Sequence, residues 1–127
     1  GLQLHNETLL EIAIRVNVFY NNASIPEDLV DYLSLATFHT PRCVEALANV
    51  TRNVIGEAHT DDILADITVP TLIIWGAKDG VLDFTYAADF NSSIPGSRLA
   101  AIPDCGHLPH VECQEKTAAI IRDFLSR

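Results

Sequence analysis

A short run between a proline and a glycine gives the first indication of the fold: Pro70-Thr-Leu-Ile-Ile-Trp-Gly-Ala-Lys-Asp-Gly80. Its residues 71–75 are mostly apolar and rich in β-branched and aromatic side chains, and the run is too short for an ordinary helix. Such a run is typical of a strand buried on both faces, as in a parallel sheet. We therefore predict a strand over 71–75 and a loop that begins at Gly76.

A second strand is predicted further along the chain, at Arg98-Leu-Ala-Ala-Ile102. A helix over about 83–93 and a Pro95-Gly96 turn separate the two strands. A crossover of about 20 residues suits a right-handed βαβ unit, in which the strands are parallel. A last helix carries apolar residues at helical spacing: Ala118, Ile120, Ile121, Phe124 and Leu125.

The preceding residues predict helices. Residues 1–24 are ambiguous: apolar residues over 9–19 fit a helical face, and those over 12–20 fit a period of two equally well. We favour a helix to about Arg15 followed by extended chain. Ser24-x-x-Glu27 is a capping box before a short helix, and a further helix is predicted up to Gly56. The chain therefore divides into a helical part, residues 1–56, and a βαβα part, residues 57–127.

Composition excludes several classes of protein. The 127 residues are 48% apolar, which permits one domain with a real core. Seventeen acidic side chains against eight Lys and Arg give a net charge of −9. This balance argues against a nucleic-acid partner and against docking on an anionic membrane. The chain contains no Met and begins in helix-like sequence, so we expect a piece of a longer protein.

The cysteines favour a reducing compartment, because they are odd in number and widely spaced and so predict free thiols: Cys43, Cys105 and Cys113. Four Asn-x-Ser/Thr sequons would matter only in a secretory pathway, and they begin at Asn6, Asn22, Asn49 and Asn91. Localisation is unknown from the sequence, with the cytoplasm favoured.

Two loops follow the carboxyl ends of the predicted strands, where sites form in open α/β sheets. The first contains Asp79 and the second contains His107. Adjacent strand ends can bring a carboxylate within hydrogen-bonding distance of an imidazole. The carboxylate then holds one tautomer and stabilises the imidazolium, which is what a general base requires. Asp83 is the competing acid, and we assign it to the N-cap of the following helix.

At these loops the sequence resembles the last third of an α/β-hydrolase. The matching segments are Val69-Pro-Thr-Leu-Ile-Ile-Trp-Gly-Ala-Lys-Asp79 and Asp104-Cys-Gly-His107-Leu-Pro-His-Val-Glu112. In that family the first segment bears the triad acid and the second the triad histidine, in the chain order Ser, Asp, His. Asp79-Gly-Val-Leu-Asp83 and the C-terminal helix are most similar to the monoacylglycerol-lipase and bacterial lipase-esterase branch.

The resemblance implies an α/β fold, the C-terminal part of an α/β-hydrolase with two parallel strands and flanking helices. Residues 1–56 would be the remnant of a helical cap, its end and the helix that returns to the sheet. It also implies a serine hydrolase acting on carboxylic esters, an esterase or lipase, without metal or organic cofactor. His107 would deprotonate the nucleophile and then protonate the leaving group, while Asp79 would orient His107. Val81 and Leu108 flank the two loops and are the candidate substrate-binding residues.

The sequence departs from the family in one respect: no Gly-x-Ser-x-Gly occurs in it. The chain therefore lacks a nucleophile and is expected to be inactive alone. Its expected partners are a small ester or acyl substrate and an N-terminal half or another chain that completes the sheet, with homo-oligomers as the other possibility.

Three alternatives stay open. The same segment occurs in carbon–carbon hydrolases, lactonases and dehalogenases, which the identity of the nucleophile would distinguish. Some family members bind ligands with slow turnover or none. The chain could also be an inert half-domain that serves only assembly.

Other side chains near the second loop admit different interpretations. A tetrahedral zinc site is conceivable at Cys105, His107, His110 and Cys113, but the spacing fits no common zinc motif, and we expect no metal. We expect His110 to support the histidine loop by hydrogen bonding and Glu112 to favour the next helix's N-terminus. Four aromatic residues either line an acyl pocket or simply pack: Phe19, Tyr20, Tyr32 and Phe38.

Overall fold

A two-stranded parallel sheet forms the centre of the computed structural model, which describes residues 12–26, 28–30, 32–33, 42, 45–46, 49 and 61–127. Strand β1 covers Leu72–Gly76 and strand β2 covers Arg98–Ile102, with Leu72 paired to Arg98 and Gly76 to Ile102. Helix α5, Thr85–Ser93, joins the strands. The predicted parallel βαβ unit is confirmed, with its first strand shifted by one residue.

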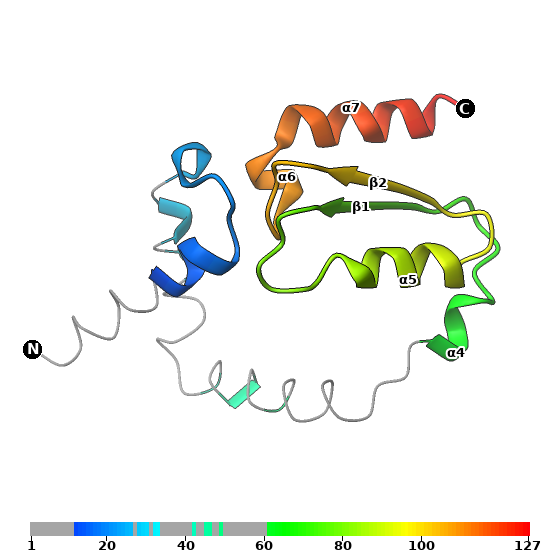
Figure 1. Ribbon diagram of the computed structural model, residues 1–127, viewed down its shortest axis with the longest axis horizontal. Helices are drawn as coiled ribbons and strands as arrows, with labels where there is room; N and C mark the ends of the chain where they lie inside the picture. The colour runs from blue at the N-terminus through cyan, green and yellow to red at the C-terminus, as the bar shows by residue number, and fades with distance from the viewer. Residues whose placement is uncertain are drawn as a thin grey trace, which may run out of the picture.

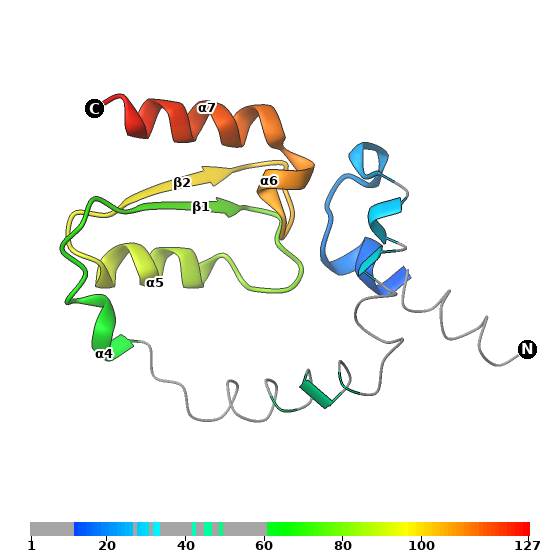
Figure 2. The same cartoon turned by 180° about the vertical axis from the view of Figure 1, so that it is seen from behind.

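Helices cover both faces of this sheet (Figure 1). The sheet lies between α5 and the C-terminal helix α7, Gln114–Leu125. The short helix α6, Pro109–Glu112, lies at the carboxyl ends of the strands, and α4, Asp61–Leu64, lies at the opposite end. Figure 2 shows the same order from behind. Helices α5 and α7 therefore cover both faces of the parallel pair in part.

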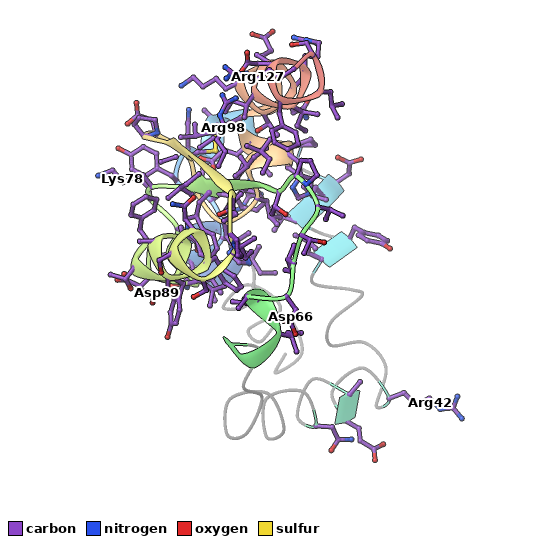
Figure 3. All side chains as sticks on the ribbon, turned by 90° about the vertical axis from the view of Figure 1, so that its right-hand side faces the viewer. Arg42, Asp66, Lys78, Asp89, Arg98 and Arg127 are labelled. Atoms are coloured by element: carbon purple, nitrogen blue, oxygen red, sulfur yellow. A yellow bond between two sulfur atoms is a disulfide. The ribbon has the colours of Figure 1, made fainter. Side chains whose placement is uncertain are left out.

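Ion pairs join the start of β2 and the end of the chain to α7. Figure 3 shows Arg98 and Arg127 on the same side of the molecule, and both pair with Asp123, at 2.7 and 3.1 Å. All three side chains are exposed, so these pairs add little to stability.

The core is small. Its buried apolar side chains come from the sheet, its helices and the N-terminal part: Phe19, Val30, Leu64, Ala87, Ile94, Ile102 and Cys105. Trp75 packs against Phe90 of α5 with ring centroids 6.5 Å apart. The prediction that the first strand is buried on both faces is wrong for the described residues, where 72–75 are only half-buried. The reason is that β2 is the one strand that pairs with β1 there.

Two glycines shape the strand ends. Gly96 has φ of 72° in the turn before β2, a conformation that side chains rarely adopt. At Gly76 a Cβ atom would collide with the backbone of Cys105 and Gly106. The missing side chain lets the two loops approach each other, and Lys78 N donates to Cys105 O at 2.9 Å between them.

The N-terminal part of the described chain, residues 12–26, 28–30 and 32–33, contacts the loop that follows β2 at the carboxyl ends of the strands. Residues 12–17 are helical, two residues beyond the predicted end at Arg15, and a 3₁₀ helix, η1, follows at Asn22–Ser24. Figure 1 shows this part beside α6. The boundary at 56/57, Glu27 of the capping box, Phe38 and most of the helix predicted up to Gly56 lie outside the described residues. No helix of the described part is long and apolar enough to cross a membrane.

Candidate active site

Asp79 and His107 meet beyond the carboxyl ends of the two strands. Asp79 Oδ2 lies 2.9 Å from His107 Nδ1. The Asp79 side chain is 4% exposed and that of His107 is 31% exposed. The hydrogen bond expected between these residues is therefore present, and a carboxylate acceptor assigns the ring proton to Nδ1.

The other carboxylate oxygen of Asp79 is held by the backbone. Its Oδ1 accepts from Val81 N at 2.8 Å and from Leu82 N at 3.0 Å. Burial by itself would raise the pKa of Asp79, but the hydrogen bonds from His107, Leu82 and Val81 outweigh burial and hold the pKa below its usual value of 3.8. Asp79 is thus a fixed anion next to the imidazole.

The histidine loop is anchored to the N-terminal part. His107 N donates to Val18 O at 2.7 Å, which fixes the backbone of the histidine itself. Within the described residues no group hydrogen-bonds to His107 Nε2. The ring is therefore oriented at Nδ1 and open at Nε2, the arrangement that a general base uses toward a nucleophile.

Asp83, the competing acid, is occupied elsewhere. Its Oδ1 accepts from the backbone N of Thr85 at 2.8 Å and from Thr85 Oγ1 at 2.7 Å, where α5 begins. These bonds, the backbone one first, lower the pKa of Asp83. Its carboxylate serves the first turn of the helix, although Phe84 occupies the N-cap position itself.

The candidate substrate-binding residues flank the pair in the sequence. Val81 is 49% exposed and Leu108 is half-buried. Their substrate-binding role stays a prediction. A cavity of about 470 Å³ lies elsewhere: it is lined by Asn21, Asp104, Val111 and residues 112–116, and neither Asp79 nor His107 reaches it.

The expectation of free thiols is wrong for two of the three cysteines. Cys105 and Cys113 form a disulfide with Cα atoms 6.3 Å apart. The turn at His107 and helix α6 fold the intervening residues back, which brings the two Cα atoms into disulfide range. This bond removes the argument for a reducing compartment; Cys43 lies outside the described residues.

The same disulfide bears on the conceived zinc site, because its two sulfur atoms are bonded to each other. Among the residues that the structure describes, no group of three or more His, Cys, Asp or Glu side chains is placed to hold a metal ion.

Two expectations for the histidine loop are wrong. His110 is exposed, and its side chain makes no hydrogen bond to the described residues. Glu112 does not serve the following helix: it ends α6, is 9% exposed, and accepts backbone N–H groups from Gly106, Tyr20 and Asn21. The sequence did not predict that Glu112 accepts these backbone N–H groups. The local sequence offers one signal for it: Glu112 is the single acidic residue in the short run Leu108-Pro-His-Val-Glu112.

The aromatic residues of the N-terminal part have different environments. Phe19 is 3% exposed and packs in the core, whereas Tyr20 is 51% exposed with Lys78 Nζ 6.0 Å from its ring centroid. Tyr32 is 67% exposed. Of the two interpretations given for these aromatic residues, packing in the core is the one that the structure shows for Phe19.

Comparisons with known proteins identify relatives of this chain. The mouse monoacylglycerol lipase ABHD6 is 45% identical over 60 residues, which cover 47% of this chain and 18% of the lipase. A 2-hydroxy-6-oxononadienedioate/2-hydroxy-6-oxononatrienedioate hydrolase from Klebsiella pneumoniae is 27% identical over the whole chain and half of its own length. An esterase of Exiguobacterium antarcticum superposes with a TM-score of 0.71 and 25% identity, covering 98% of this chain and 44% of the esterase.

The chain thus spans half or less of the length of these relatives, all of which are named as hydrolases. The sequence model of the family described as the alpha/beta hydrolase fold matches residues 19–113, a stretch that includes both strands and both loops. Since this match extends over well more than half of the 127 residues, the chain belongs to the α/β-hydrolase family.

Proposed function

We propose that this chain supplies the acid and the base of a serine-hydrolase triad that cleaves carboxylic esters, and that the nucleophile comes from residues outside it. The observation that carries the proposal is the 2.9 Å contact of Asp79 Oδ2 with His107 Nδ1, with the second oxygen of Asp79 held by two backbone N–H groups. The esterase and lipase among the relatives support the same class of substrate.

In the proposed reaction His107 acts through Nε2. It accepts the proton as a serine oxygen adds to the ester carbonyl, and the imidazolium is stabilised by the anion of Asp79. The same proton then passes to the leaving alcohol as the carbon–oxygen bond breaks. Water repeats the sequence on the acyl-enzyme and releases the acid. No cofactor is required, and Val81 and Leu108 are the proposed contacts to the substrate.

The missing nucleophile explains why we propose a partner. An N-terminal half, or another chain, would complete the sheet and present the serine and the oxyanion donors near Nε2. Each missing oxyanion donor alone costs roughly 10²–10³-fold in rate, so the 127 residues by themselves are proposed to be inactive.

A second candidate reaction is hydrolysis of a carbon–carbon bond, in which the same Asp–His pair would serve. The Klebsiella pneumoniae relative favours it, because that protein matches the whole chain and is named as a hydrolase of 2-hydroxy-6-oxononadienedioate and 2-hydroxy-6-oxononatrienedioate. Lactonase and dehalogenase activities remain further alternatives, as does a non-catalytic ligand-binding or assembly role.

The test uses the longest natural protein that contains these residues, assayed on short p-nitrophenyl esters, a monoacylglycerol and a 2-hydroxy-6-oxo dienoate. We expect ester hydrolysis that falls roughly 10⁴-fold or more in His107→Ala. His110→Ala is the matched control, because this exposed histidine lies three positions away and makes no contact that the proposal uses.

The outcomes separate the candidates. Dienoate cleavage without ester cleavage would establish the carbon–carbon reaction, and bound ligand without turnover would establish the non-catalytic role. Ester turnover that is indifferent to His107 would refute the proposed triad. The 127-residue chain alone should show no turnover above its own His107→Ala variant.

A further inference from the structure

Glu112 is a buried carboxylate that the proposed reaction does not use. It is 9% exposed, and within the described residues no Lys, Arg or His pairs with it. Burying a charge costs free energy unless hydrogen bonds replace the lost water. A carboxylate in this position therefore needs hydrogen-bond donors that replace the lost water.

Those partners are backbone N–H groups from two separate segments. Glu112 Oε2 accepts from Gly106 N at 2.6 Å. Its Oε1 accepts from Tyr20 N at 3.0 Å and from Asn21 N at 2.5 Å. One oxygen thus holds the Cys105–Gly106 peptide, one residue before His107, and the other holds a segment more than 90 residues away in the chain.

The backbone of Gly106 and His107 lies close against residues 18–20. His107 N donates to Val18 O at 2.7 Å, so the same distant segment also binds the histidine backbone. A Cβ atom on Gly106 would lie 2.6 Å from Val18 O and 2.8 Å from both Glu112 Oε2 and Tyr20 N. The backbone around His107 is therefore held by the carboxylate on one side and by residues 18–21 on the other.

We infer that Glu112 is a positioning residue for His107, an inference that rests on the proposed function. By fixing the Cys105–Gly106 peptide, which lies next to the backbone of His107, it keeps Nδ1 aimed at Asp79 and Nε2 aimed at the nucleophile. It acts on the backbone and touches neither the imidazole nor the substrate. It also ties the segment that carries Tyr20 to the same loop.

The principal variant is Glu112→Gln. A glutamine keeps one acceptor oxygen and replaces the other by an NH₂ group, which must face a backbone N–H whichever way the amide is turned. Either Gly106 or the Tyr20–Asn21 pair then loses its acceptor. Glu115→Gln is the control, since it removes the same charge from an exposed position at the start of α7.

The first readout is the tautomer of His107, measured by long-range ¹⁵N–¹H NMR of the imidazole together with amide exchange at Gly106, Tyr20 and Asn21. Wild type should hold the Nδ1–H form. Glu112→Gln should populate the Nε2–H form and expose the three amides to exchange, whereas Glu115→Gln should match wild type. A merely structural role would lower the melting temperature without moving the tautomer of the folded protein.

The second readout is kinetic, in the natural protein that hydrolyses ester. Misplacement of the base by about 1 Å costs roughly 10²-fold, so kcat of Glu112→Gln should fall by about that factor while KM stays near wild type. If Glu112→Gln fails to fold, Glu112→Asp is the variant to measure. An aspartate keeps the charge, but its side chain is one methylene too short to bind both Gly106 and the Tyr20–Asn21 segment. It should shift the tautomer in the same direction.

A folded Glu112 variant with the wild-type tautomer and wild-type kcat overturns the inference, even where His107 proves essential for ester hydrolysis. Conversely, a tautomer that changes in Glu112→Gln supports the positioning role even if wild type hydrolyses no ester, and the proposed function alone then fails.

Discussion

Hydrogen bonds fix the orientation of the Asp79 side chain. Both of its oxygens are occupied, one by His107 and one by the N–H groups of Val81 and Leu82. A carboxylate so bound cannot rotate without losing two hydrogen bonds of its own loop. The hydrogen bonds therefore hold the anion in one orientation beside the imidazole of His107.

The lowered pKa of Asp79 predicts a pH dependence of stability. Well above pH 3.8 the group is ionised in both the folded and the unfolded state, and its full stabilisation is present. As the pH falls below this value, the unfolded state binds the proton first, and the stabilisation is lost through the lower pKa of the folded state.

The measurement is the free energy of unfolding of wild type and Asp79→Asn in urea from neutral pH to the acid range. The advantage of wild type over the variant should shrink below pH 3.8, the usual value for this carboxyl group. Parallel profiles at all pH values would contradict the expected role of the ionised carboxylate.

At the scale of elements, the segment between Cys105 and Cys113 is constrained by a covalent cross-link. It contains the histidine, all of α6 and Glu112, and the disulfide closes it into a ring with eight residues of sequence separation. A cross-link over so short a loop removes freedom mainly from the unfolded chain. The disulfide loop and the carboxylate of Glu112 within it restrain the same stretch of backbone around Gly106.

Cys113→Ser should therefore lower the free energy of unfolding by about 2–3 kcal/mol, the chain-entropy value for a loop of this length. Urea unfolding of wild type with and without reductant should show a similar difference, whereas Cys113→Ser should be insensitive to reductant. Alkylation of both Cys105 and Cys113 without prior reduction, read by peptide mapping, would count against the bond.

At the scale of the whole molecule, the described sheet consists of one pair of strands, each with one outer edge. Its strands are half-buried, and several large apolar side chains are exposed, among them Val16, Val69 and Tyr86. Two-stranded sheets are marginal in water, and free edges bind other strands. The chain also spans half or less of the length of the relatives described above.

We predict that the 127-residue chain self-associates or binds a second polypeptide that supplies further strands. Sedimentation velocity at increasing concentration should show assemblies of the 127-residue chain alone. Fewer assemblies should form when the chain is part of the longer natural protein, or when a partner polypeptide that supplies further strands is added. A stable, monodisperse monomer at high concentration would contradict the prediction.

Local patterns sufficed for a large part of this protein. The β-branched run before Gly76 and the run over 98–102 predict the two strands, and their order along the chain predicts that Asp79 and His107 share one sheet edge. These inferences hold because strand formation and parallel pairing depend on neighbouring residues and on the length of the crossover.

Tertiary structure alone decided the surroundings of the pair. Cys105 bonds to Cys113, and Glu112 binds Tyr20 across 92 positions of sequence, contacts that no periodicity or motif specifies. They depend on how the backbone turns after β2 and on which distant segment lies against that turn. Because a buried carboxylate takes whichever donors the folded chain brings to it, its partners are known only once the chain has folded.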